Sequence, residues 1–247
     1  MPRKARERSE TGIYHVMLKG IDKKDIFAGK QDYEKFLYYV NRAMEISKFE
    51  VYGYCLMPNH VHILLKEGTE KIGDAIRRIA VGYAQYFNIK YGRNGHLFQN
   101  RFRSEPVNDD VYFLIVLRYI HQNPIKANMV INMEEYEWSS YNEYIMKSKR
   151  EITNIKFAME LFSNIKNFKK FMMERNKDKC LEYNERIRYT DKELEKMIMS
   201  IIDISKLKEL DKETRDEVLR EIKNVTKASN RQLSNVTGIG RGIWEKV

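Results

Sequence analysis

The sequence predicts an α+β fold in which an antiparallel sheet is flanked by helices. The first observation is that short β-branched and aromatic runs alternate with longer helical patterns in the first half of the chain. The second is a pair of strand-like runs separated by a two-residue turn. The third is composition, because 43% hydrophobic residues in a chain of 247 suffice for a sizeable core.

The chain opens with a strand, a helix and a hairpin. A β-branched and aromatic run over residues 13–19 ends at Gly20 and predicts a strand. Apolar residues at helical spacing then predict a helix over residues 31–48. Two further strands are predicted over residues 49–57 and 60–66. Because only a Pro-Asn turn separates them, they should pair as an antiparallel hairpin.

A helix, a fourth strand and a further helix complete this half of the chain. Helical periodicity runs over residues 70–91, and residues 101–107 predict a strand. The next helix is predicted over residues 109–121, with Asp109 or Asp110 at its start. The order strand, helix, hairpin, helix, strand, helix is typical of a ferredoxin-like antiparallel sheet.

The remainder of the chain is predicted to be helical. We expect a main domain over residues 1–145, a helical linker region over 146–189 and a small helical domain over 190–247. The last residues, 230–247, have the pattern of a helix-turn-helix with its turn at Gly238, which would place the second helix in a DNA major groove. The alternative is a helical appendage that packs or dimerises.

Positive charge is concentrated in the first half of the chain. The net charge is +10 and the pI is near 9.3, and residues 1–128 hold 21 basic but only 14 acidic side chains. Residues 77–104 contain no carboxylate and interleave basic with aromatic side chains. Such a segment predicts a groove for single-stranded nucleic acid; the alternative is a solvated basic face over core aromatics. The candidate DNA-binding residues are Arg77, Arg78, Lys90, Arg93, Arg101 and Arg103.

Several classes of protein are excluded by the same composition. No apolar run reaches the roughly 18 residues of a membrane span, and the basic N-terminus is followed by no apolar signal-peptide stretch. We therefore expect a cytoplasmic, nucleoid-associated protein. Cys55 and Cys180 form neither a CxxC pair nor a disulfide framework. Lys4, Arg6 and Arg8 in the N-terminal arm are expected to attract phosphates.

Two histidines alternate on the predicted third strand. His60 and His62 flank Val61, so both imidazoles should project from one face of the sheet, roughly 6–7 Å apart along the strand. Two imidazoles in this arrangement can share one metal ion. The alternative is a pair of half-exposed polar residues with no site.

A second group of polar side chains lies in residues 118–124, RYIHQNP. Tyr119 and Asn123 are four apart on a helix and therefore share a face. Asn123 offers an oxygen that a hard divalent cation accepts beside imidazole, and Tyr119 is a candidate nucleophile; the alternative for the tyrosine is core packing. Tyr112 lies two turns earlier, but the spacing to Asn123 favours Tyr119. We expect His121 to be structural or to contact substrate.

Three strings in the right order, GIYHVMLKG, GYCLMPNHVHILL and LRYIHQNP, carry a family resemblance. Over about residues 8–145 the chain closely resembles the single-tyrosine HUH transposases of the insertion-sequence-200-like superfamily. Among these it is most similar to the REP-associated tyrosine transposases. The resemblance implies an HUH catalytic core in residues 1–145 and Tyr119 as nucleophile. It also implies a divalent metal, Mg²⁺ or Mn²⁺, with ligands His60, His62 and Asn123.

The resemblance also implies a reaction. It predicts cleavage and rejoining of single-stranded DNA at hairpin or palindromic ends, by transesterification through a 5′-phosphotyrosine. The expected partner is single-stranded or hairpin DNA and no membrane, and a monomer and a homodimer both remain compatible. One alternative is a non-catalytic nucleic-acid-binding protein that retains the fold. The other is a metal-dependent phosphodiesterase that uses water instead of tyrosine.

Overall fold

The structure is a computed structural model that describes residues 6–148, 150–175, 180–181, 190–226 and 228–247. Contacts divide the chain into two compact units, Met1–Glu182 (unit 1) and Tyr183–Val247 (unit 2). Among the described residues, no helix has both the length and the apolar character that crossing a bilayer requires.

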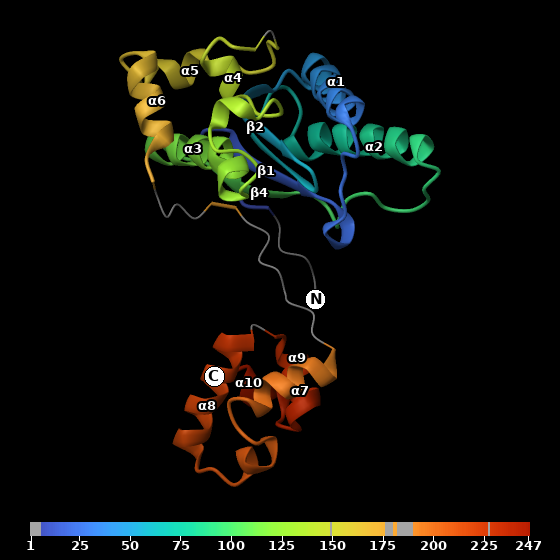
Figure 1. The fold of residues 1–247 in the computed structure, drawn as a ribbon, viewed down its shortest axis with the longest axis vertical. Helices are drawn as coiled ribbons and strands as arrows, with labels where there is room; N and C mark the ends of the chain where they lie inside the picture. The colour runs from blue at the N-terminus through green and yellow to red at the C-terminus, as the bar shows by residue number, and fades with distance from the viewer. Residues whose placement is uncertain (1–5, 149, 176–179, 182–189, 227) are drawn as a thin grey trace. The chain divides into compact units, whose positions relative to one another are not determined.

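Unit 1 is built on a four-stranded antiparallel sheet with strand order β2-β3-β1-β4 (Figure 1). Two long helices connect these strands in the order strand, helix, strand, strand, helix, strand, so the predicted α+β, ferredoxin-like fold is confirmed. A short 3-10 helix, η1 (Ile21–Lys23), follows the first strand. The elements of the sheet layer are β1 (Ile13–Lys19), α1 (Lys30–Ser47), β2 (Glu50–Met57), β3 (His60–Lys66), α2 (Ile72–Lys90) and β4 (Arg103–Pro106).

One face of the sheet packs against α1 and α2. Because side chains alternate along a strand, every second residue of the central strands faces these helices. Fully buried aromatic side chains from the two helices, Phe36 and Tyr83, meet edge to face in this core. The strand residues on this side include Val16, Leu18, Val61, Ile63 and Leu65.

The opposite face of the sheet is covered by α3 (Asp110–Lys126). The Asp109 side chain caps this helix by accepting a hydrogen bond from the backbone N–H of Tyr112 at 2.7 Å. Close approach depends on Gly53 of β2, because a Cβ there would lie 2.6 Å from Leu117 Cδ1. The helix therefore packs closely on the sheet and contacts the side chains that project from this face.

Further helices extend this second layer, within the region expected to be a linker. Phe168 and Met172, from α6 (Ile165–Met173), are fully buried in the same apolar cluster as α3. Residues 176–179 and 182–189 of the expected linker lie outside the described residues. The additional elements of unit 1 are η2 (Met133–Glu135), α4 (Tyr141–Tyr144), α5 (Lys156–Glu160) and α6 (Ile165–Met173).

Unit 2 is helical and has its own core. Trp244, Leu219 and Leu233 are fully buried in it. Gly238 ends α9 (Asn230–Thr237) in the left-handed conformation, with φ of 68°, at the position predicted for a helix-turn-helix turn. The following helix has only four residues, and its role in DNA binding stays a prediction. The elements are α7 (Asp191–Met199), η3 (Ile204–Lys208), α8 (Lys212–Thr226), α9 (Asn230–Thr237) and α10 (Arg241–Trp244).

Candidate active site

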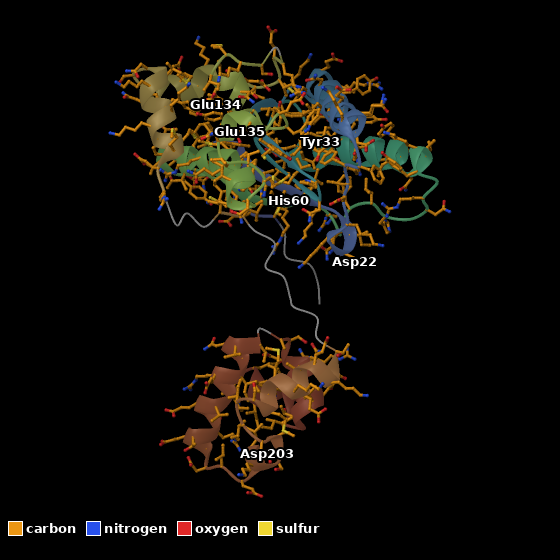
Figure 2. All side chains as sticks on the ribbon, viewed as in Figure 1. Asp22, Tyr33, His60, Glu134, Glu135 and Asp203 are labelled. Carbon is orange, nitrogen blue, oxygen red and sulfur yellow. The ribbon has the colours of Figure 1, made fainter. Side chains whose placement is uncertain are left out.

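The two histidines of β3 lie on the sheet face that α3 covers. In the ladder with β1, His62 is opposite Met17 and His60 is opposite Lys19. Val61, between them, is buried in the other core. The imidazole ring centroids are 5.0 Å apart and the rings are perpendicular; His60 is labelled in Figure 2. Both rings therefore lie side by side, as the alternation of a strand predicts.

Each imidazole uses its Nδ1 atom in a hydrogen bond and keeps Nε2 for another partner. Nδ1 of His60 lies 2.6 Å from the side-chain oxygen of Asn59, and Nδ1 of His62 lies 2.9 Å from Nε2 of His15. Burial, with a smaller effect of the Lys19 charge, lowers the pKa of His60 to about 4. Burial likewise holds the pKa of His62 well below its usual value. Both rings are therefore neutral near pH 7, which is the form that ligates metals.

Helix α3 brings Tyr119 and Asn123 to the same place. The Tyr119 ring centroid is 5.5 Å from that of His62, and the phenol ring is nearly perpendicular to the imidazole. The Asn123 side chain hydrogen-bonds to His60 and donates through Nδ2 to the Tyr119 carbonyl oxygen at 2.8 Å. Lys126 Nζ lies 4.7 Å from the centroid of the Tyr119 ring. The structure thus gathers all four residues that the sequence singled out for chemistry.

Two other residues of the same helix have different hydrogen-bond partners. Tyr112 hydrogen-bonds to Glu105, and burial raises its pKa. His121 is completely buried, with Nε2 2.8 Å from the hydroxyl of Ser140 and its pKa lowered to about 3 by burial. Its ring packs edge to face against Tyr144. These contacts favour the structural role for His121.

The sequence did not reveal two residues that join the histidine pair. His15, on β1, is fully buried, and its Nδ1 atom lies 2.9 Å from Oε1 of Glu105 on the neighbouring strand β4. The two are direct cross-strand partners and therefore share a face. A signal was present, because His15 is a polar residue within the otherwise apolar stretch IYHVML, and a buried polar group needs a partner.

The donor set fits a divalent cation of the Mg²⁺ or Mn²⁺ class. In the part of the chain that the structure describes, no three His, Cys, Asp or Glu side chains are grouped to hold a metal. The predicted set is instead two neutral imidazoles and one amide. Hydrogen bonds already engage Nδ1 of His60 and of His62, and Asn123 contacts His60. Imidazole nitrogen with amide oxygen suits such an ion, with waters or phosphate oxygens completing its shell.

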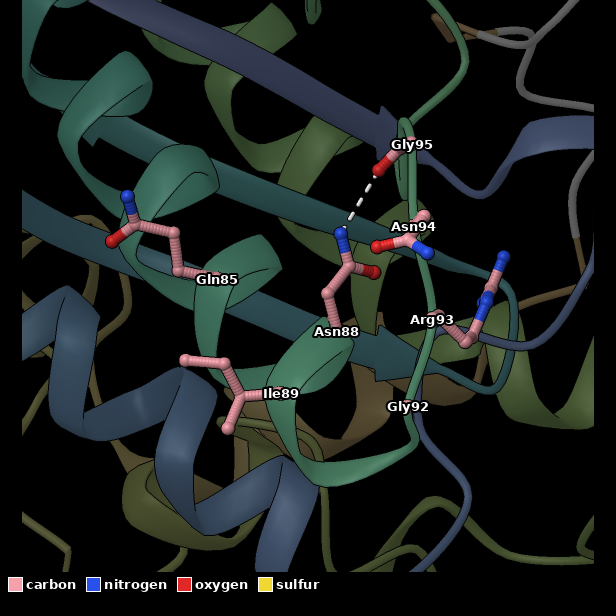
Figure 3. Close-up of a pocket in the computed structure, with 7 residues that line it drawn as sticks. All are labelled: Gln85, Asn88, Ile89, Gly92, Arg93, Asn94 and Gly95. Atoms are coloured by element: carbon pink, nitrogen blue, oxygen red, sulfur yellow. Dashed lines mark hydrogen bonds between the residues drawn. The ribbon is translucent and has the colours of Figure 1, made fainter.

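The six basic candidates for DNA binding are spread over α2, the connection after it and β4. Three of them are paired with carboxylates: Arg77 with Asp74 at 3.0 Å, Arg78 with Glu70 at 2.7 Å and Lys90 with Asp32 at 2.7 Å. Of the interleaved aromatics, Tyr83 and Phe87 are buried in the core and cannot stack on bases. Arg93 lines an open cavity of about 580 Å³ near the C-terminal end of α2, where Asn88 donates to the Gly95 carbonyl (Figure 3).

The buried carboxylate of Asp32 accepts hydrogen bonds from several side chains and backbone groups, and we expect its replacement by asparagine to destabilise unit 1. Burial alone would raise the pKa of Asp32, but hydrogen bonds from Lys90, Tyr91, the Ala28 N–H and Tyr86 lower it. Because the pKa of the folded state is depressed, this stabilisation is present above the carboxyl's ordinary pKa and lost as the pH falls through the folded value. Asp32→Asn should cost about 2–4 kcal/mol in urea unfolding at pH 7.

The control for this prediction is Glu34→Gln, on the same helix. Glu34 is exposed, so its substitution should change the free energy of unfolding by less than about 0.5 kcal/mol. Equal effects of the two substitutions would contradict the assignment of Asp32 as the anchor of Lys90.

A second cavity is lined by apolar and aromatic side chains together with three arginines, Arg6, Arg77 and Arg101. It has a volume of about 370 Å³ and lies between α2 and the connection to β4. Arg6 stacks on Phe102 at 3.9 Å from the ring centroid. Burial, and then the nearby charge of Arg101, lower the pKa of Arg6. Two guanidinium groups that repel one another beside an aromatic ring favour an anionic, aromatic ligand. Lys4 of the same arm lies outside the described residues.

Comparisons with known proteins relate the first part of the chain to a transposase family. Residues 9–123 match the family model described as "Transposase IS200 like". A Haemophilus influenzae protein named as a REP-associated tyrosine transposase is 30% identical over 107 residues, an alignment covering 38% of this chain and 60% of that protein. A solved REP-associated tyrosine transposase bound to a REP hairpin has the same fold, with a TM-score of 0.51 at 17% identity. That comparison covers 63% of this chain and 90% of the other.

Proposed function

Residues 9–123 belong to the IS200-like transposase family, and from this premise we propose that the chain cleaves and rejoins single-stranded DNA through a covalent tyrosine intermediate. One observation carries the proposal: Tyr119 lies against the imidazole of His62, beside His60 and Asn123. A nucleophile next to a cation-binding set is the arrangement that phosphoryl transfer requires. The solved relative is bound to a REP hairpin, which supports hairpin DNA as the substrate.

The proposed reaction conserves the energy of the phosphodiester. The phenol oxygen of Tyr119 bonds to phosphorus, the bond from phosphorus to the 3′ oxygen breaks, and the products are a 5′-phosphotyrosine and a free 3′-hydroxyl. Attack by another 3′-hydroxyl reverses the step and joins the ends, so no nucleotide triphosphate is needed. A divalent ion held by His60, His62 and Asn123 would neutralise charge on the non-bridging oxygens.

The chain's own residues assist the phenol. A tyrosine has an ordinary pKa near about 10, so its proton must leave as it attacks. The Lys126 ammonium, 4.7 Å from the ring centroid, stabilises the developing phenolate. Asn123 donates through Nδ2 to the Tyr119 carbonyl oxygen and contacts His60. One turn of α3 therefore connects the backbone of the nucleophile to the proposed cation ligands of β3.

The cavity beside Arg6 is the proposed contact for the single-stranded part of the substrate. Its aromatic wall suits an unpaired base, and the charges of Arg6 and Arg101 suit the adjoining phosphates. The paired basic residues of α2 are expected to attract DNA phosphates less strongly, because carboxylates already neutralise Arg78 and Lys90. Recognition is thus proposed to concentrate at this cavity rather than along the whole basic segment. We also propose unit 2 as an additional duplex contact.

Phe102→Ala is expected to weaken binding of a hairpin with a single-stranded flank by about 5–150-fold, because stacking contributes about 1–3 kcal/mol per base. Fluorescence anisotropy at fixed salt measures this. Arg6→Ala should lower the affinity and also flatten its salt dependence by about one counterion. Arg42→Ala is the control, because Arg42 is an exposed arginine on α1 that lines no cavity near Arg6. Equal losses for Arg6→Ala and Arg42→Ala would contradict the assigned contact.

Covalent capture of DNA tests the proposed function. The full chain is incubated with a hairpin oligonucleotide labelled at its 3′ end and with Mn²⁺, and the products are separated on a denaturing gel. A labelled band at the mass of protein plus DNA supports the proposal. Cleavage without such a band indicates hydrolysis by water, as in a phosphodiesterase. Binding without cleavage of any hairpin indicates a nucleic-acid-binding protein that retains only the fold.

A further inference from the structure

His62 is connected to a carboxylate through a second histidine. Its Nδ1 atom lies 2.9 Å from Nε2 of His15, and Nδ1 of His15 lies 2.9 Å from Oε1 of Glu105. His62 is 1% exposed and His15 is not exposed at all, so bulk water does not compete for the bond between them. The three side chains come from β3, β1 and β4 and share the sheet face under α3.

Glu105 fixes the direction of these hydrogen bonds. Burial alone would raise the pKa of Glu105, but hydrogen bonds from His15, the Leu181 N–H and Tyr112 hold it below its usual value. An ionised carboxylate only accepts hydrogen bonds, so Nδ1 of His15 carries a proton. In the neutral form of His15 that proton is the only one on the ring, so its Nε2 atom accepts, and Nδ1 of His62 is then the donor.

We propose that Glu105 and His15 are positioning residues that keep the proton of His62 on Nδ1, so that Nε2 presents its lone pair to a divalent cation. The inference rests on the proposed function, which gives the cation its role. Neutral histidine in water favours the opposite tautomer, with the proton on Nε2, and that form cannot ligate through this atom. The hydrogen-bonded series Glu105, His15 and His62, called the relay below, therefore holds His62 in the ligating tautomer before a metal ion binds.

General features of metal sites support this role. Ligating histidines commonly donate their second ring N–H to a carboxylate or carbonyl, and loss of that partner costs about 10–100-fold in metal affinity. Here His15 stands between the ligand and the carboxylate. Simple packing does not account for the arrangement, because apolar side chains would fill the same space without burying two imidazoles and part of a carboxylate.

The decisive measurement is the tautomer of His62 in the metal-free full chain. Nitrogen NMR distinguishes protonated from bare ring nitrogens, and resonances are assigned with His60→Asn and His62→Asn. In the wild type, the proton of His62 is expected on Nδ1. In Glu105→Gln, the amide can donate to Nδ1 of His15, which moves that ring's proton to Nε2. The His62 proton should then shift, at least in part, to Nε2.

Mn²⁺ binding, followed by electron paramagnetic resonance of the free ion, provides the second readout. Glu105→Gln should bind Mn²⁺ about 10–100-fold more weakly than the wild type. Glu105→Asp keeps the carboxylate and should recover part of the loss. The matched histidine control is His96→Asn, because His96 is exposed and lies outside the relay. Its affinity should equal that of the wild type within about twofold.

Two results would overturn the inference. One is a wild-type His62 protonated on Nε2, and the other is an unchanged Mn²⁺ affinity in Glu105→Gln with its melting temperature preserved. Glu105 is suited to this test because its side chain is 23% exposed, so an isosteric amide does not disrupt the core. Failure of the proposed function is seen separately, as absence of the covalent DNA adduct in the wild type.

Discussion

Tyr119→Phe is expected to abolish the covalent protein–DNA adduct and to reduce strand cleavage by at least about 1,000-fold, the scale on which covalent enzymes lose activity without their nucleophile. Removing one oxygen leaves the ring in its contacts with His62 and His15, so the site keeps its shape. Binding of hairpin DNA should stay within about twofold of wild type. The readouts are the adduct band and the cleavage rate in single-turnover assays.

The matched control is Tyr112→Phe, on the same helix. Tyr112 hydrogen-bonds to Glu105, so its loss weakens one support of the relay but removes no reacting atom. The adduct should still form, with a cleavage rate reduced by less than about tenfold. An adduct that persists in Tyr119→Phe and disappears in Tyr112→Phe would show that Tyr112, and not Tyr119, is the nucleophile.

His60→Ala is expected to remove most metal-dependent cleavage, by at least about 100-fold. The reasoning is that loss of an outer-shell partner alone costs about 10–100-fold, and a direct ligand should cost at least as much. His60 is the partly exposed member of the pair and contacts Asn123, so its truncation opens little of the core. Cleavage is measured against Mn²⁺ concentration after treatment of the protein with a chelator.

Two comparisons make the His60 result specific. His96→Ala removes an exposed imidazole elsewhere and should leave the Mn²⁺ dependence unchanged. Hairpin binding by His60→Ala in the absence of metal should match that of the wild type. Wild-type cleavage that proceeds in excess chelator would contradict the assigned role of the histidine pair.

The fold and the two residue pairs of the site, His60 with His62 and Tyr119 with Asn123, follow from local patterns, whereas the resemblance to a family implied that the two pairs form one site. Alternation over IYHVMLK and HVHILLK, and the short Pro-Asn turn, specify which faces and neighbours the strands have. Spacing of four along a helix places Tyr119 beside Asn123. These are short-range properties of the sequence, and the structure reproduces them.

The partners of buried and charged groups were not predictable, because they come from long-range pairing. Glu105 meets His15 across 90 residues, through the pairing of β4 with β1. Asp32 meets Lys90 across 58 residues, where α1 packs on α2. The basic-aromatic pattern predicts Lys90 as a phosphate contact, and the structure pairs it with the carboxylate of Asp32. The packing of Phe168 onto the α3 layer was not predictable either, because it is also a contact between segments far apart in the sequence.

The odd–even parity of three strands determines which insertions and deletions this chain can tolerate. His15, His62 and Glu105 share one face only because the registers of β1, β3 and β4 agree. A single-residue deletion inside β4 that slips its register would turn Glu105 toward the opposite face and uncouple it from the histidines. A two-residue deletion would return the side chain at this position to the original face of the sheet but would not place Glu105 opposite His15. Length variation among descendants should therefore fall in connections such as residues 91–102, and the strands should change by substitution alone.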